Sequence, residues 1–189
     1  GKIFNKFFIN ENKVNFFENI IFGCILLTFI ALSINFFFSL NEKLNLIFIF
    51  LPSFLYFFID KREIKNDLKY LILFSLLTVL LISLEKTNRP DAGLYHLPFI
   101  GILNESNLLV GVSNLHFRFG HTSIIQYLSA IYNNIFFTSN GILVPTSIIF
   151  LALLGYLINE AIIKRKDRVY SFLSTIFSSY VLINMNRYS

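Results

Sequence analysis

Residues 88–129 read NRPDAGLYHLPFIGILNESNLLVGVSNLHFRFGHTSIIQYLS and form a polar island between apolar runs. All three histidines of the chain lie in this island, together with an aspartate directly after a proline and an arginine between two phenylalanines. The apolar runs on both sides are long enough to cross a bilayer as helices. Any chemistry that this chain performs is therefore expected in residues 88–129.

Composition indicates the class of protein. Hydrophobic residues make up 55% of the chain and charged residues only 14%, whereas about a quarter of the residues in soluble domains are charged. We therefore predict an all-α integral membrane protein. Long apolar segments occur at 19–40, 44–59, 69–84, 141–163 and 169–185.

Each apolar segment is close to the roughly 20 residues that cross about 30 Å of hydrocarbon, so we predict a polytopic bundle of five transmembrane helices. The second and third segments are at the short limit, and a re-entrant pair is the alternative. Pro52 is expected to kink the second helix.

Basic residues predict the orientation, because Lys and Arg collect in cytoplasmic loops. Of the 16 basic residues, 11 lie in three groups, at residues 2–13, 61–69 and 164–168. These groups share one side if the N-terminus is cytoplasmic, which makes 85–140 an extracytoplasmic loop. We predict a multi-pass protein of the inner (cytoplasmic) membrane, in contact with membrane lipid and with no nucleic-acid partner.

Residues 1–189 are predicted to form a single transmembrane domain. The first apolar run is full length and no small-residue cleavage pattern follows it, so it is expected to remain as an anchor. The chain begins at Gly1 without a methionine and stops as though a new external loop were starting, so we expect the N-terminal part of a longer protein. The single cysteine, Cys24, lies inside the first run and can form no internal disulfide.

Two interfacial amphipathic helices are predicted in the external loop. Asp91 is a suitable N-cap for the first, which Pro98 would bend and in which apolar residues recur every third position, at Leu94, Leu97, Ile100 and Leu103. The second is predicted over 121–137, where one stripe contains Ile124, Leu128, Ile131 and Ile135.

The pattern Asp-x-x-x-Tyr-His-Leu-Pro at 91–98, followed by Phe-Gly-x-x-Ser at 119–123, resembles the first external loop of polytopic C-type glycosyltransferases. It is most similar to the bacterial protein-mannosyltransferase and lipid A aminoarabinose transferase group, and covers about a quarter of the chain. The resemblance implies a cell-envelope transferase that moves a sugar from a polyprenyl-phosphate donor to an extracytoplasmic acceptor. Here the acidic loop follows the third helix instead of the first, and Ala92 and Gly93 stand where many members carry a second acid.

Sugar transfer onto a hydroxyl needs a carboxylate that accepts the proton and cations that stabilise the departing phosphate. Asp91 suits the first role, with helix capping as the alternative. Arg118 suits the second, because a guanidinium binds phosphate oxygens through paired hydrogen bonds; contact with lipid headgroups is the alternative. Further substrate-binding candidates are Tyr95, His96, His116 and His121. Three tyrosines could stack on a sugar, namely Tyr95, Tyr127 and Tyr132, but an aromatic belt at the membrane interface is the commoner explanation for all three.

No cofactor is predicted. The spacings of His96, His116 and His121 do not match the i, i+4 pairs of zinc-binding helices, and the missing second acid removes support for a divalent metal. A competing function is a transporter or flippase for a lipid-linked saccharide, and a third is a non-catalytic structural subunit. The scarcity of charged residues within the apolar segments favours the enzyme over the transporter.

The predicted orientation can be tested with single cysteines. A cysteine at Asn107 should react with a membrane-impermeant thiol reagent in intact cells, and a cysteine at Asn66 should not, because the two residues are predicted on opposite sides of the membrane. Reversed labelling would overturn the orientation and place the polar island on the cytoplasmic side.

Overall fold

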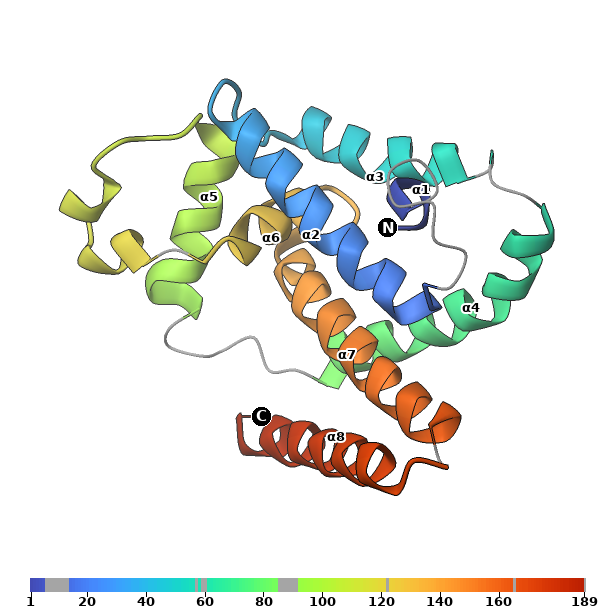
Figure 1. The fold of residues 1–189 in the computed structure, drawn as a ribbon. Helices are drawn as coiled ribbons and strands as arrows, with labels where there is room; N and C mark the ends of the chain where they lie inside the picture. Colours follow the sequence, from blue (N-terminus) through green and yellow to red (C-terminus); the bar gives the residue numbers. More distant parts are fainter. Residues whose placement is uncertain are drawn as a thin grey trace.

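The computed structural model describes residues 1–5, 14–56, 58, 61–84, 92–121, 123–164 and 166–188. Over these residues every regular element is a helix and no strand forms, which confirms the all-α prediction (Figure 1). Each of the five apolar segments is a helix: α2 (Phe16–Asn35), α3 (Glu42–Tyr56), α4 (Lys61–Leu84), α7 (Leu143–Ile163) and α8 (Arg168–Tyr188). Asp91, the predicted N-cap, lies outside the described residues.

Two of these helices are long and apolar enough to cross a membrane, α2 and the segment 140–163 that contains α7. Only 11% and 28% of their apolar windows are buried inside the protein, so these helices expose apolar surface as lipid-facing helices do. The five-span bundle is not confirmed. With 15 residues, α3 is about 22 Å long, shorter than the hydrocarbon layer, and α4 begins with two turns rich in charged residues.

Shorter elements complete the chain, and most of them lie between α4 and α7. They are α1 (Lys2–Phe4), the π-helical turn η2 (Ala92–His96), α5 (Leu97–Glu105), the 3-10 turns η3 (Val112–Asn114) and η4 (Phe117–His121), α6 (Ile125–Tyr132) and the 3-10 turn η5 (Thr138–Ile142). The loop after α2 is joined to the end of α5, since the Leu40 N–H donates to the Leu103 carbonyl (2.9 Å). Residues 92–142 therefore gather at the C-terminal end of α2 and the N-terminal end of α7 (Figure 1).

The first external helix differs from its predicted stripe. Ile100 and Leu103 are buried together with Phe99, whereas Leu94 and Leu97 are exposed. Because η2 is a π-helical turn, its wider winding breaks the three-residue register ahead of α5. Pro98 lies in the first turn of α5, where its missing N–H interrupts no bond within that helix.

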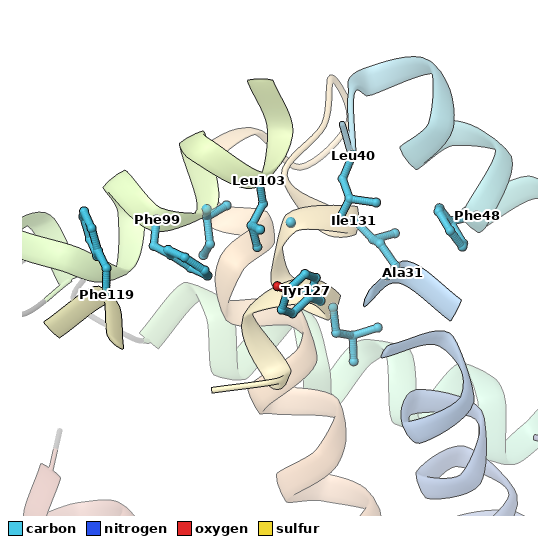
Figure 2. Packing of buried hydrophobic residues seen from close by; sticks show 11 residues of the cluster. Ala31, Leu40, Phe48, Phe99, Leu103, Phe119, Tyr127 and Ile131 are labelled. Carbon is cyan, nitrogen blue, oxygen red and sulfur yellow. The ribbon is translucent and has the colours of Figure 1, made fainter. Parts of the chain in front are cut away.

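The second helix predicted in the loop between α4 and α7 is shorter than expected and is buried in the core. Instead of covering 121–137, α6 has eight residues, and six consecutive ones, 126–131, are buried. Helices α2, α3, α5 and α7 all contact α6. It provides Tyr127, Leu128, Ala130 and Ile131 to the core, which Figure 2 shows packed against residues of α2, α3 and α5. Of the predicted apolar stripe only Leu128 and Ile131 are buried, whereas Ile124 and Ile135 are exposed and lie outside α6. The polar face, with Gln126 and Ser129, is buried as well.

Asparagine side chains make this burial possible. The last carbonyls of a helix have no partner within it, and the Ala130 carbonyl near the end of α6 accepts hydrogen bonds from Asn45 (2.9 Å) and Asn104 (3.0 Å). The Ile131 carbonyl accepts from Asn134 (3.0 Å). Asn104 also accepts a hydrogen bond from the side chain of Asn133 (2.8 Å). Side chains of α3, α5 and the following loop thus replace water at the end of α6.

Replacing Asn45 should destabilise the fold. Asn45→Ala removes a fully buried donor to the Ala130 carbonyl, so the free energy of unfolding should fall by about 1–3 kcal/mol. Thermal unfolding in detergent would measure this, with Asn107→Ala at an exposed position as the control that should change it by less than about 0.5 kcal/mol. Equal effects of the two substitutions would contradict the role of Asn45.

Candidate functional site

Arginine and aromatic side chains meet where the η4 turn folds over η2. The guanidinium carbon of Arg118 lies 4.8 Å from the centroid of the Tyr95 ring and 5.7 Å from that of Phe117. A guanidinium over an aromatic face is attracted by the ring's negative π surface, an interaction worth about 0.5–2 kcal/mol. The partly buried Arg118 side chain is thereby oriented by residues from two separate segments.

A turn at Gly111 and an anchor at Phe119 position this segment. Gly111 has φ of 85°, a left-handed conformation that glycine adopts without a steric penalty, and η3 begins directly after it. Phe119 is buried, and its ring centroid lies 5.8 Å from that of Phe99 in α5 (Figure 2). The loop is therefore held on the core at Phe119, and the neighbouring Arg118 is placed beside η2.

His96, the last residue of η2, is hydrogen-bonded to α6. Its Nδ1 lies 2.8 Å from the side-chain nitrogen of Gln126, and its ring centroid lies 4.2 Å from that of Tyr95. Because an amide nitrogen can only donate, Nδ1 accepts and the neutral ring carries its proton on Nε2. His96 thus presents an N–H on the side that faces away from α6.

His116 is oriented in the same way by the loop itself. Its Nδ1 accepts the backbone N–H of Arg118 at 3.3 Å, and its ring stacks on Phe117 and packs against Phe119, with centroid distances of 5.1 and 5.4 Å. In the neutral ring the proton again lies on Nε2. Both histidines therefore offer an N–H donor in the segments that hold Arg118.

The structure brings together four of the six predicted site residues, Tyr95, His96, His116 and Arg118. Asp91 lies outside the described residues; in sequence it stands four residues before Tyr95. The backbone of His121 is part of η4, and its side chain lies outside the described part. Gln126 is a further candidate site residue that was not predicted from the sequence, although a glutamine within an apolar stretch was the available signal.

The two tyrosines of α6 make contacts inside the protein. Tyr127 is buried in the core. The ring of Tyr132 packs against Phe137, and burial raises the pKa of its hydroxyl to about 12. That hydroxyl stays protonated at neutral pH and is not a general base.

No set of three His, Cys, Asp or Glu side chains that could hold a metal ion occurs among the residues that the structure describes. The cluster instead combines one permanent cation with N–H donors and aromatic faces. Such groups bind an anionic oxygen, a phosphate above all, through charge-assisted hydrogen bonds. The cluster therefore presents groups of the kind that bind phosphate.

A cavity of about 1150 Å³ lies elsewhere, between α1 and the helices α2, α3 and α4. An ion pair lines it, in which Lys2 Nζ lies 2.6 Å from Asp67 Oδ2, and the hydroxyl of Tyr56 donates to the same oxygen at 3.1 Å. Tyr95, His96, His116 and Arg118, the predicted site residues whose side chains the structure describes, do not line this cavity.

Over the described residues, fold and site together define a helical protein with two helices long and apolar enough to span a membrane and a cluster of one arginine with aromatic side chains. The chain belongs to the family described as Domain of unknown function (DUF8201), whose sequence profile matches residues 1–189. No curated protein and no solved structure matches the chain.

Proposed function

We propose that this protein is a membrane glycosyltransferase that transfers a sugar from a polyprenyl-phosphate donor to an extracytoplasmic acceptor. The observation that supports this proposal best is the placement of Arg118 over Tyr95 in the same cluster as His96 and His116. A donor of this class carries its negative charge on phosphate, and the guanidinium binds phosphate in a fork of two hydrogen bonds. The sequence motif around Asp91 supports the same class of reaction.

In the proposed reaction the acceptor hydroxyl oxygen attacks the anomeric carbon of the sugar. The bond between that carbon and the phosphate oxygen breaks, and its electron pair leaves with the polyprenyl phosphate. Arg118 and the Nε2–H groups of His96 and His116 stabilise the charge that grows on the phosphate. Asp91 accepts the proton of the hydroxyl as general base.

The same proposal includes five membrane spans with a cytoplasmic N-terminus. Beyond α2 and α7, the other long helices carry exposed large apolar side chains, which lipid would cover: Phe50 and Phe54 on α3, Leu76 and Val79 on α4, and Phe172 and Phe177 on α8. With the basic segments inside, the ends of α2 and α7 that carry the cluster face outward. The donor phosphate and the acceptor would then meet at the outer surface.

A transporter or flippase for a lipid-linked saccharide is the second candidate, and the cavity beside α2 favours it. The Lys2–Asp67 pair lines that cavity at the end that the same topology places on the cytoplasmic side, where a solute path would open. In this case Arg118 would bind the phosphate head without reaction. Sugar transfer by the purified protein separates the two candidates.

Asp91→Asn should abolish most of the transfer. The substitution keeps the size of the side chain and most of its capping ability, so stability should fall by less than about 1 kcal/mol, while transfer by the full-length protein should fall by about a hundredfold or more. Glu105→Gln, at an exposed residue of α5, is the matched control and should transfer normally. Near-normal transfer by a well-expressed Asp91→Asn variant would remove Asp91 as the base.

Arg118→Lys separates donor binding from contact with lipid headgroups. If Arg118 holds the donor phosphate, lysine should be clearly impaired, because its point-like ammonium cannot form the paired contact. If Arg118 only contacts anionic lipid, lysine should serve almost as well. The Michaelis constant for the donor would be measured beside Arg168→Lys, an exposed position at the start of α8. Equal behaviour of the two variants would argue against phosphate binding at Arg118.

A further inference from the structure

Gln126 of α6 is hydrogen-bonded to His96 and thereby links the candidate site to the centre of the fold. It extends from α6, is only 5% exposed, and directs its side-chain nitrogen at His96 Nδ1. Its side-chain oxygen Oε1 is buried without a hydrogen-bond partner among the described residues. Native proteins pair nearly all buried polar atoms, so a role for this oxygen is expected.

We propose that Gln126 is a positioning residue that fixes the ring of His96 and keeps a proton on its Nε2 in both charge states. In the neutral ring the amide nitrogen donates to Nδ1, which places the proton on Nε2. In the protonated ring Nδ1 also carries a proton and would oppose the amide nitrogen. A half-turn of the carboxamide then brings Oε1 to Nδ1–H as acceptor, because a carboxamide has a donor at one corner and an acceptor at the other.

This inference deepens the proposed function and rests on it for its chemical meaning. A constant Nε2–H gives the donor phosphate a hydrogen bond that does not depend on the charge of His96. Among the described residues, the titratable or charged side chains in contact with η2 include Tyr95 in η2 itself and Arg118 from η4, and His116 accepts the backbone N–H of Arg118. Of the residues of α6, Gln126 is the one hydrogen-bonded to His96.

The position of the proton can be observed without any assay of transfer. Full-length protein labelled with ¹⁵N-histidine in lipid nanodiscs, with His96 assigned through His96→Asn, should show neutral His96 protonated on Nε2 and accepting at Nδ1. In Gln126→Glu the carboxylate can only accept, so the neutral ring should carry its proton on Nδ1. The pH midpoint of His96 protonation in this variant should then rise by about one pH unit or more, because a neighbouring carboxylate favours the charged ring.

Ser129→Ala is the matched control, since Ser129 is another buried polar residue of α6 and donates to the Ile142 carbonyl (3.3 Å). It should leave the His96 signals unchanged. A wild-type ring protonated on Nδ1, or a Gln126→Glu spectrum identical to that of the wild type, would overturn the proposal. If Gln126→Glu does not fold, the wild-type spectrum alone still tests the proposal, because it shows which nitrogen of neutral His96 carries the proton.

Transfer kinetics test the catalytic consequence separately. Gln126→Met keeps the length of the side chain and removes both hydrogen-bonding atoms, so kcat should fall roughly tenfold, as expected for a misplaced site group. If the wild type transfers sugar and Gln126→Met matches its rate across the pH range, the positioning role is wrong and the proposed function stands. If the wild type transfers no sugar, the proposed function is wrong, and the ¹⁵N spectra still decide whether Gln126 controls His96.

Discussion

Burial of α6 is the constraint on which the rest of the structure depends. A helix of eight residues enclosed by α2, α3, α5 and α7 has lost the water that would otherwise satisfy its terminal carbonyls. Asn45 and Asn104 supply that hydrogen bonding from two different helices. Because both donors must reach one carbonyl, the positions of α3 and α5 relative to α6 are fixed together.

The candidate site is attached to this centre at two points. Phe119 packs against Phe99 at the surface of α5, and His96 is hydrogen-bonded to Gln126 of α6. The loop from 106 to 121 has little regular structure of its own, yet it holds Arg118 over Tyr95 because these contacts hold the two segments together. Functional groups on loops are commonly positioned in this way by a rigid scaffold.

Polar residues in this protein divide into two kinds with different tasks. Asparagines inside the bundle complete the hydrogen bonding of the backbone, and they are surrounded by apolar side chains. In the 92–121 segment, His96 and His116 instead accept hydrogen bonds at Nδ1, which leaves Nε2–H of each neutral ring as a donor. A phosphate-bearing ligand would find its donors among the second kind, which is why the proposed reaction is assigned there.

The sequence by itself determined the helical class, all five apolar helices and the segment in which the candidate site lies. Those features depend on composition, on apolar length and on a local clustering of histidines with an arginine, and each is readable within a short window of residues. The sequence could not determine that α6 is buried, because the polar residues on its second face predicted exposure. Burial depends on hydrogen bonds to the Ala130 carbonyl from Asn45 and Asn104, which are distant from α6 along the chain. The partnership of Gln126 with His96 across 30 residues was likewise decided only by the tertiary structure. Hydrogen bonds between distant segments leave no periodic pattern in the sequence, so only the packing of α5 against α6 reveals them.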